Sequence, residues 1–359
     1  MQTTSGGNVI ISRTPFRISF FGGGTDYPGW YRENGGQVLS TTIDKYCYIS
    51  LRYLPPFFSH RIRLVYSNME NCQHFSEIKH PSARETLRFL GLDRNLEIHH
   101  DADLPSRSGM GSSSSFTVGL LHALYALRGV MPGPKRLAEE SIHIEQDMIQ
   151  ETVGSQDQTA AAFGGFNHIL FGRDGEIEVR PLTIGAQRLR SLSDHVMLFY
   201  TGIMRTASSV AHTYVEDLGA KANHLRRMSE MVGESLDILM GDGDIRCFGE
   251  LMHDAWQAKK SLGSKITSPA INDVYERARA AGCIGGKLLG AGGGGFFCFF
   301  APPEVHRRVR ESLRELLYVP VCFSRHGSQI VFFDPPREDF AGLEKERYEN
   351  DCCVFQEMT

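Results

Sequence analysis

The stretch from Pro105 to Ser115, PSRSGMGSSSS, constrains this chain more than any other, because it leads directly into the apolar run FTVGLLHALYAL. Two glycines and four consecutive serines at the start of a helix present backbone N–H groups and hydroxyls at the positive end of the helix dipole. Such a helix start suits phosphate groups. A flexible cap of small residues would have a similar composition. The sequence therefore predicts a nucleotide-phosphate loop, with a simple helix cap as the alternative.

The nucleotide-binding signatures of the most familiar folds are missing from this sequence. The P-loop pattern G-x-x-x-x-G-K-[ST] fails because Lys287 is followed by Leu288. The H-R-D and D-F-G elements of protein kinases are absent. No glycine-rich turn has the strand and helix around it that a dinucleotide site requires. A phosphate loop in this chain therefore belongs to another fold.

Length and charge limit the kind of ligand. A chain of 359 residues with 41% hydrophobic content is long enough for about two domains with real cores. The net charge of −4 gives no electrostatic field for nucleic acid or an anionic membrane, so phosphate recognition has to be local. No apolar run approaches the ~20 residues needed to span a bilayer. We expect a small-molecule ligand and no nucleic-acid or membrane partner, and we leave a homodimer open.

The cysteines and histidines give no sign of a metal cluster. The eight cysteines form no C-x-x-C pair, and most lie in apolar surroundings such as GFFCFF, so we expect buried thiols and no structural zinc. His99 and His100 are consecutive on an expected strand, where their side chains point to opposite faces, so they are expected to be structural. Buried thiols and the lack of a signal peptide predict a cytoplasmic protein.

The order of expected elements indicates an α+β fold. Strands are expected at residues 8–19 (interrupted at Pro15), 38–54, 61–67, 95–105, 166–171, 176–182, 195–202, 296–301, 319–324 and 329–334. Helices are expected at 81–92, 115–128, 135–151, 209–240, 245–261, 268–281 and 303–316, and a turn at 153–165. The helix at 115–128 is apolar almost all round and is expected to be central. A polar break near 183–193 divides the chain into domains 1–188 and 189–340 and a tail, 341–359.

Three separated motifs occur in a fixed order: RISFFGGGTDY, PSRSGMGSSSS and KLLGAGGGGF. Together they resemble the galactokinase, homoserine kinase, mevalonate kinase and phosphomevalonate kinase (GHMP) family over about residues 17–296. The resemblance implies a two-domain architecture, with an N-terminal domain like ribosomal protein S5 domain 2 and a C-terminal ferredoxin-like α/β sandwich. It also implies an ATP-dependent small-molecule kinase with Mg²⁺ as the metal.

The resemblance assigns the middle motif to the ATP phosphates. The residues that would bind them are Pro105, Gly109, Met110, Gly111, Ser112, Ser113 and Ser114. The C-terminal glycine run would pack against this loop and shape the cleft, with Gly292 and Gly293 close enough for backbone approach to the substrate. A tight structural turn beside a core strand is the alternative for this run.

The resemblance also implies the catalytic pair. Asp157, in GSQDQ, matches the aspartate beside the acceptor hydroxyl. Arg17 matches the arginine of the galactokinase stretch R-V-N-L-I-G-E-H-T-D-Y, where it could pair with Asp157 and the γ-phosphate. Because aspartate also favours turns for its own sake, Asp157 has a structural alternative.

The magnesium ligands follow from the same resemblance. Glu145, in HIEQD, matches the carboxylate and Ser113 the hydroxyl. Glutamates on helices are usually solvated, so Asp147 and Glu151 remain rivals for this role.

The first motif departs from galactokinases where they grip the sugar. Gly23 and Gly24 replace a Glu-His pair, whereas Thr25, Asp26 and Tyr27 are retained, so these five residues are expected to contact a bulkier or phosphorylated sugar. This version of the motif looks most like the D-glycero-D-manno-heptose 7-phosphate kinases, which phosphorylate the anomeric hydroxyl and supply nucleotide-activated heptose for bacterial surface polysaccharide. The alternatives are a kinase for fucose, galactose or a different heptose, and a catalytically silent sugar-binding relative.

A heptose 7-phosphate also needs cationic partners for its phosphate. The stretch TGIMRTAS, with Thr201 and Arg205, matches the same group of kinases and is expected to contact the substrate. Arg205, Lys45, Lys260 and Lys265 are the candidate cations, although each of them is more often a surface charge than a ligand.

Overall fold

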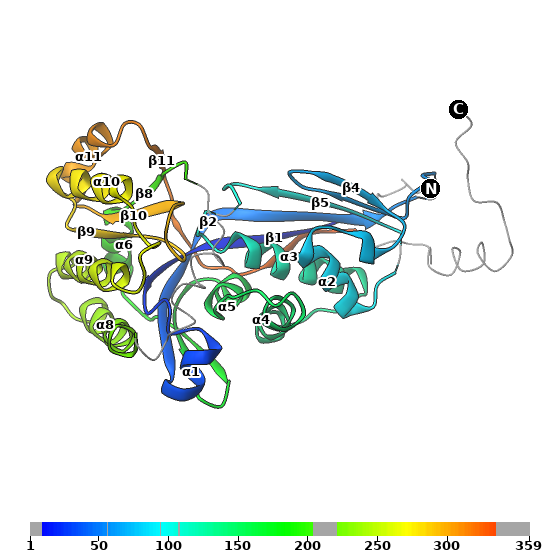
Figure 1. Ribbon diagram of the computed structural model, residues 1–359, viewed down its shortest axis with the longest axis horizontal. Helices are drawn as coiled ribbons and strands as arrows, with labels where there is room; N and C mark the ends of the chain where they lie inside the picture. The colour runs from blue at the N-terminus through cyan, green and yellow to red at the C-terminus, as the bar shows by residue number, and fades with distance from the viewer. Residues whose placement is uncertain (1–8, 56, 94, 107, 204–220, 335–359) are drawn as a thin grey trace, which may run out of the picture.

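The computed structural model describes residues 9–55, 57–93, 95–106, 108–203 and 221–334. Two β-sheets, each covered by helices, lie toward opposite ends of an elongated molecule (Figure 1). The mixture of helices and mostly antiparallel strands agrees with the predicted α+β class. In the described part of the chain, no helix is long and apolar enough to cross a membrane.

The first sheet has nine strands in the order β13-β1-β2-β5-β3-β4, with β12 and β6 also paired to β2, and β7 paired to β6. Its strands are β1 (Val9–Phe21), β2 (Gly36–Tyr53), β3 (Ile62–Val65), β4 (Met69–Cys72), β5 (Leu96–Ala102), β6 (Phe166–Phe171), β7 (Ile177–Pro181), β12 (Phe323–Ser324) and β13 (Gln329–Phe333). Its helices are α1 (Pro28–Asn34), the 3₁₀ turn η1 (Phe75–Glu77), α2 (Pro81–Leu90), α3 (Ser112–Leu127), α4 (Pro134–His143), the π-helix η2 (Ile144–Met148) and α5 (Gln156–Phe163). Helices α2 to α5 cover one face of this sheet (Figure 1).

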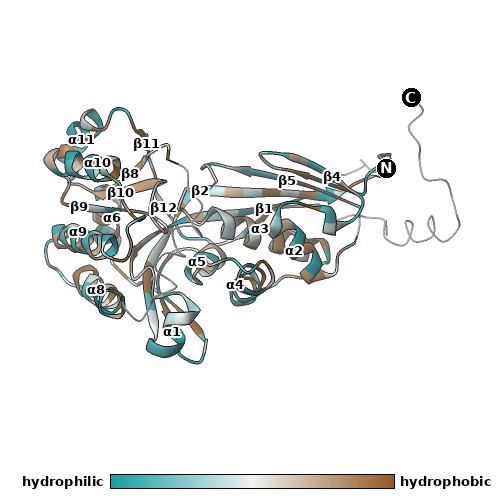
Figure 2. Ribbon diagram, viewed as in Figure 1, coloured by the Kyte–Doolittle hydropathy of each residue, from teal (hydrophilic) through white to brown (hydrophobic). Residues whose placement is uncertain are grey.

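The second sheet has four antiparallel strands in the order β11-β8-β10-β9. Its strands are β8 (Val196–Tyr200), β9 (Gly285–Leu288), β10 (Phe296–Phe300) and β11 (Leu317–Val319). Its helices are α6 (Ala186–His195), α8 (Ala222–Met240), α9 (Arg246–Lys260), α10 (Pro269–Ala280), the 3₁₀ turn η3 (Pro303–Val305) and α11 (His306–Ser312). Figure 2 shows hydrophilic residues on the outer surfaces of these helices, as expected for helices that bury one face against a sheet.

Strand β10 is buried on both faces, because its side chains alternate between two hydrophobic cores. Phe297 and Phe299 pack with Trp256 and Tyr275 in one core. Phe296, Cys298 and Phe300 belong to the other, which also contains much of the first sheet. This explains the unbroken apolar run FFCFF, which is typical of a strand with no solvent face.

Helix α3 is central, as its composition predicts. Every residue from Ser114 to Ala126 is buried. Gly119 lets the helix lie directly on β1, because a Cβ there would come within 2.8 Å of Thr14 Oγ1. The Ser12 hydroxyl donates a hydrogen bond of 2.8 Å to the Gly119 carbonyl at the same place. The sequence of α3 therefore fixes the predicted phosphate loop, at the N-terminus of this helix, to the first sheet.

The chain returns to the first sheet near its C-terminal end. The expected strand 319–324 is instead two strands in different sheets: β11 pairs with β8, and β12 pairs with β2. Pro320 lies between them and has no N–H for a ladder, which favours a break. The division of the chain at 188–189 stays a prediction, but β12 and β13, which it assigns to the second domain, belong to the first sheet.

Three other expected boundaries were wrong. Strand β1 continues through Pro15, and its pairing with β2 shifts register between Pro15 and Arg17 instead of ending there. The expected break at 183–193 contains most of α6, whose Leu192 is buried. The expected helix 303–316 ends at Ser312, because residues 317–319 pair with β8 as a strand.

Two further expectations concern residues at the site. The expected turn at 153–165 contains α5, which carries Asp157 in its first turn. The single helix expected over 135–151 is α4 followed by the π-helix η2, in which Ile149 N–H bonds to the Ile144 carbonyl. The first twelve residues of the helix expected over 209–240 lie outside the described residues, and α8 begins at Ala222.

Candidate active site

The phosphate loop makes two tight turns before α3. Gly109 and Gly111 have φ angles of +79° and +78°, which glycine adopts without strain. Gly111 is the N-cap of α3, and no described side chain caps this helix end. Glycine is a common N-cap, and several other helices of this protein also begin without a side-chain cap. The start of α3 is therefore compatible with a phosphate site, although the missing cap alone does not identify one.

The C-terminal glycine run packs directly against this loop. A Cβ on Gly109 would lie 2.7 Å from the Leu289 carbonyl oxygen, and one on Gly290 would lie 2.6 Å from the Gly109 Cα. A Cβ on Gly295 would lie 2.1 Å from the Ser108 carbonyl oxygen. The two motifs are nearly 180 residues apart in sequence, and glycine is required at each contact because backbone meets backbone.

Gly292 and Gly293, which were expected to approach the substrate, pack against Ile266 instead of against the loop before α3. The Gly293 N–H donates a hydrogen bond of 2.8 Å to the Ile266 carbonyl, and a Cβ on Gly292 would also meet Ile266. The Thr201 hydroxyl and N–H both donate to the Gly295 carbonyl, so Thr201 holds the glycine run in place. Arg205 lies outside the described residues.

Arg17 and Asp157 form the ion pair that the resemblance implies, and the structure shows that the pair is bidentate. Arg17 Nε and Nη2 donate to the two Asp157 carboxylate oxygens at 2.8 and 2.7 Å. Arg17 Nη1 donates to the Gly109 carbonyl at 2.8 Å, and Arg17 N–H bonds to the Met110 carbonyl. The Asp157 side chain remains 24% exposed, whereas that of Arg17 is only 4% exposed. The arginine therefore holds both the phosphate loop and a partly accessible carboxylate.

The register shift in β1 positions Arg17. Bulges bend a strand and re-aim its side chains, and this one falls immediately before the arginine. Gly111 also lies beside the ion pair, since a Cβ there would be 3.4 Å from Asp157 Oδ2. The serine loop and Asp157 thus share one site.

The triple-glycine turn lies next to the helix that carries Asp157. Asp26 is fully buried, and its carboxylate accepts hydrogen bonds from the N–H groups of Gly24 (2.9 Å) and Gln156 (3.3 Å). Ser155 N–H bonds to the Asp26 carbonyl, and Gly154 leaves room for the Asp26 carboxylate. Burial, together with the charge of Asp157, raises the pKa of Asp26 to about 6. Asp26 therefore caps α5 from a distant part of the chain.

The other predicted sugar contacts divide into buried and accessible residues. Thr25 is fully buried, and its hydroxyl donates to the carbonyls of Gly22 and Gln37, so it fixes the turn. Gly24 is also buried, whereas Gly23 is half-buried beside the Gln156 amide. Tyr27 is half-buried and lines a pocket.

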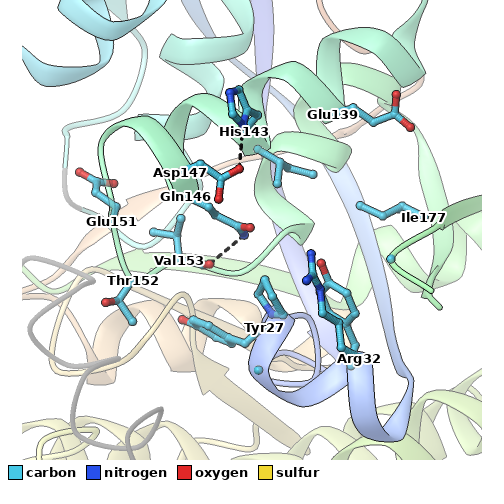
Figure 3. Close-up of a pocket in the computed structure, with 15 residues that line it drawn as sticks. Tyr27, Arg32, Glu139, His143, Gln146, Asp147, Glu151, Thr152, Val153 and Ile177 are labelled. Atoms are coloured by element: carbon cyan, nitrogen blue, oxygen red, sulfur yellow. Dashed lines mark hydrogen bonds and ion pairs between the residues drawn. The ribbon is translucent and has the colours of Figure 1, made fainter. Parts of the chain in front are cut away.

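That pocket has a volume of about 470 Å³ and lies between α1 and the α4–η2 segment (Figure 3). Three carboxylates line it, those of Glu139, Asp147 and Glu151, together with one guanidinium, that of Arg32. Acidic walls repel phosphate but can accept hydrogen bonds from hydroxyl groups. The pocket is therefore better suited to hydroxyl groups than to a sugar phosphate.

Glu145 differs from its rivals by its burial and its partners. It is fully buried in η2, and its carboxylate accepts hydrogen bonds from the hydroxyls of Ser114 (2.9 Å) and Thr117 (2.7 Å) and from the Gln158 amide. Burial raises the pKa of Glu145 to about 7. Asp147 is exposed and bonds to His143, and burial raises the pKa of Glu151.

The surroundings of Glu145 fit a hard divalent cation. Carboxylate, hydroxyl and amide oxygens are the donors that Mg²⁺ prefers. The Gln158 Oε1 atom is buried there without a hydrogen-bond partner in the described structure. Ser114 makes the contact with Glu145, whereas the Ser113 side chain is exposed at the helix start. Among the described residues, no group of three or more His, Cys, Asp or Glu side chains is arranged so that it could hold a metal ion, so a metal here also needs hydroxyl or phosphate ligands.

The cation candidates for a sugar phosphate are scattered. Lys45 bonds to Asp44, Lys260 lies over the Trp256 ring, and Lys265 is exposed. Sequence reasoning gave no role to two lysines that are buried near the glycine run, Lys259 and Lys287. The burial of Lys259 could have been predicted from helical periodicity, because it lies on the apolar face of α9 with Met252, Ala255 and Trp256.

Two further expectations concern cysteine and histidine. Most of the described cysteines are buried free thiols, as expected: Cys47, Cys72, Cys283 and Cys298. Cys247 and Cys322 are exceptions, because they are exposed. On β5, the His99 ring contacts Glu97 and the His100 ring packs on Phe116, so both histidines are structural.

Comparison with known proteins relates both halves of the chain to the same family of kinases. Residues 78–165 match the family described as GHMP kinases N terminal domain, and residues 234–319 match GHMP kinases C terminal. A D-glycero-alpha-D-manno-heptose 7-phosphate kinase of Campylobacter jejuni is 26% identical over 86% of this chain and 94% of its own length. The L-fucokinase/L-fucose-1-P guanylyltransferase of Bacteroides fragilis is 26% identical over 90% of this chain but 38% of its own length.

The solved structures agree on the fold. A D-glycero-D-manno-heptose 1-phosphate kinase from Bacteroides thetaiotaomicron superposes with a TM-score of 0.73 at 22% identity, over 89% of this chain and 98% of that one. The galactokinase of Lactococcus lactis superposes with a TM-score of 0.71 at 17% identity, over 90% and 95%. The two-domain fold implied by the resemblance is confirmed. Because both domains match in order, this chain belongs to the GHMP kinases and is a small-molecule kinase.

Proposed function

We propose that this kinase transfers the γ-phosphate of ATP to the anomeric C1 hydroxyl of D-glycero-D-manno-heptose 7-phosphate, which gives the 1,7-bisphosphate. The Campylobacter jejuni relative of that name, aligned over nearly its whole length, supports this substrate. The product would supply nucleotide-activated heptose for bacterial surface polysaccharide. A cytoplasmic location and a homodimer accompany this proposal as predictions.

The observation that carries the proposal is the position of the glycine turn. Gly23 lies beside Gln156, and α5 presents Asp157 one residue later. Galactokinases resemble this motif but have a Glu-His pair where this chain has Gly23 and Gly24. Losing two large polar side chains next to the catalytic helix removes galactose contacts and leaves room for a longer sugar.

The start of α3, Arg17 and Asp157 would each have a role in the phosphoryl transfer. The N–H groups at the start of α3 would bind the ATP phosphates, and Arg17 would face the migrating phosphoryl group. Asp157, held by Arg17, would accept the hydrogen bond of the attacking hydroxyl and orient it in line. The pairing itself argues against a catalytically silent relative, because a partly exposed carboxylate is kept ready beside the phosphate loop.

Glu145 with a loop hydroxyl, that of Ser113 or Ser114, would hold Mg²⁺, which neutralises charge on the ATP phosphates when bound. The Glu145 carboxylate is already oriented for this by Thr117 and Gln158. Its high pKa would fall when a cation binds, because an opposite charge favours the ionised form.

The second candidate is a fucose kinase. The fucokinase relatives from Bacteroides fragilis and Arabidopsis thaliana support it, each over most of this chain. The chain covers only 38% and 31% of those longer proteins, so the comparison concerns one part of each.

A coupled ADP-release assay over hexoses, heptoses and their terminal phosphates tests the substrate. We expect the highest kcat/KM with heptose 7-phosphate, and no product when the anomeric hydroxyl is blocked as a methyl glycoside. A preference for unphosphorylated fucose or galactose would overturn the proposal. Activity with none of the sugars, despite ATP binding, would support a silent relative.

A further inference from the structure

Lys259 is a buried cation to which the transfer scheme gives no part. It lies near the end of α9 with 8% relative exposure, and its ammonium donates to the carbonyls of Leu288 (2.8 Å) and Gly290 (2.5 Å). No carboxylate pairs with it among the residues that the structure describes. A buried ammonium is costly unless its hydrogen-bonding groups are well satisfied. Here the groups that satisfy it are the backbone of the glycine turn.

The surroundings make this arrangement more costly still. Burial, and then the nearby charges of Lys287 and Arg17, lower the pKa of Lys259 well below its ordinary range. Lys287 is buried too, but its ammonium donates a hydrogen bond of 3.0 Å to the Phe20 carbonyl, near the end of β1. The two lysines therefore hold different parts of the backbone: Lys259 holds the glycine turn and Lys287 joins the two sheets.

A continuous line of contacts leads from Lys259 to the catalytic carboxylate. Gly290, held by the ammonium, lies against Gly109 of the phosphate loop. The Gly109 carbonyl accepts a hydrogen bond from Arg17, which pairs with Asp157. The phosphate loop is thus held between Arg17 on one side and the Lys259-bound turn on the other.

We propose that Lys259 is a positioning residue for the nucleotide: its ammonium fixes the Leu288–Gly290 turn against Gly109 and so keeps the phosphate loop in its binding conformation. The inference rests on the proposed role of this loop in ATP binding. It does not depend on which sugar is phosphorylated.

The test replaces Lys259 with methionine, which keeps the length of the side chain but has no donor. Titration calorimetry with Mg²⁺ and a non-hydrolysable ATP analogue, without sugar, measures nucleotide binding directly. We expect Kd to rise about ten- to a hundredfold, the range typical of losing hydrogen bonds to a charged group. The KM for sugar should change less than about twofold, which separates positioning from a general loss of structure.

Gly290→Ala breaks the same contact from the other side. Its Cβ would lie 2.6 Å from the Gly109 Cα, at a φ of +67°. We expect a similar rise in Kd, and little further rise in the Lys259→Met/Gly290→Ala double variant, because residues acting through one contact are not additive. If Lys259→Met does not fold, Lys259→Gln takes its place in the calorimetry, because its uncharged amide lies on a side chain too short to hold both carbonyls.

Lys287→Met is the control matched for burial and charge. We expect it to lower the melting temperature but to leave nucleotide Kd within about twofold, since Lys287 does not hold the glycine turn. Equal weakening by both lysine variants would mean that charge alone matters and would overturn the proposal, as would unchanged Kd in Lys259→Met. If the unaltered protein does not bind the analogue, the role of the loop fails instead.

Discussion

The two carboxylates proposed to act at this site, Asp157 and Glu145, have opposite surroundings. Asp157 is partly exposed and lies in a bidentate pair with Arg17. Glu145 is fully buried, and in the described structure its carboxylate is bound only by two hydroxyls and an amide. The first has its countercharge built into the protein. The second has no cationic partner among the described residues, and burial raises its pKa to about 7.

The difference is between a carboxylate that is already oriented without ligand and one whose charge depends on a ligand. The Arg17–Asp157 pair is complete without substrate and needs no rearrangement to orient a hydroxyl. Glu145, whose pKa burial raises to about 7, is only partly ionised near neutral pH, and a bound cation would favour its anion. Four changes test this comparison, from the largest expected effect to the smallest.

Asp157→Asn should lower kcat by about a thousandfold or more, because asparagine has no charge and offers Arg17 only one acceptor oxygen. Binding of the ATP analogue, measured by calorimetry, should stay largely intact, since the loop backbone is unchanged. Asp273→Asn is the control, because this exposed residue of α10 pairs with Arg277 near the surface. Full activity of Asp157→Asn would remove Asp157 from the mechanism.

Glu145→Gln should lower kcat at fixed Mg²⁺ by about a hundredfold or more, since a neutral amide binds the metal weakly. Raising the Mg²⁺ concentration should recover part of the activity, which a magnesium titration of the initial rate will show. The matching change at an exposed rival, Asp147→Asn, should leave the titration unchanged. A Glu145→Gln variant with the normal magnesium requirement would assign the metal to another residue.

The pH dependence of stability without metal should distinguish the two acids. Burial raises the pKa of Glu145 from 4.5 to about 7, so the folded state holds this proton more tightly than the unfolded state. Its contribution to stability is therefore present below pH 4.5 and is lost as the pH rises to about 7, by on the order of 3 kcal/mol. Urea unfolding at pH 5 and pH 8 measures it.

The Glu145→Gln variant is the control for that measurement. It should lose less stability between pH 5 and pH 8 than the unaltered protein, because glutamine does not titrate. The loss that remains comes in part from Asp26, whose pKa of about 6 acts with the same sign in both proteins. The same loss in both proteins would mean that Glu145 does not titrate in this range.

Asp26→Asn tests how Asp157 is positioned, because Asp26 caps the helix that carries Asp157. Asparagine can accept from only one of the two N–H groups that Asp26 binds, so the cap of α5 weakens. We expect a roughly tenfold fall in kcat, and nucleotide Kd close to that of the unaltered protein. A rise in the KM for sugar with unchanged kcat would instead make Asp26 a substrate ligand, as the sequence suggested.

Local signals predicted much of the molecule. The apolar run after the serines identified α3 and its central position, and alternating or continuous apolar runs identified most strands. They failed where a distant contact decides the local structure. Helix α5 has no side-chain cap of its own and is capped by Asp26, so GSQDQTAAAF looked like a turn. The π-helical turn around Glu145 has no comparable mark in the sequence.

The sequence by itself determined the helix start rich in serine and glycine, the glycines where backbone meets backbone, and the motif order that shows the family, because each depends on residue type and local spacing. Only the tertiary structure decided that Asp26 faces inward, that Ser114 rather than Ser113 contacts Glu145, that Lys259 holds the glycine turn, and that β12 and β13 return to the first sheet. The physical reason is that each depends on burial and on partners far away in sequence, which no local pattern specifies.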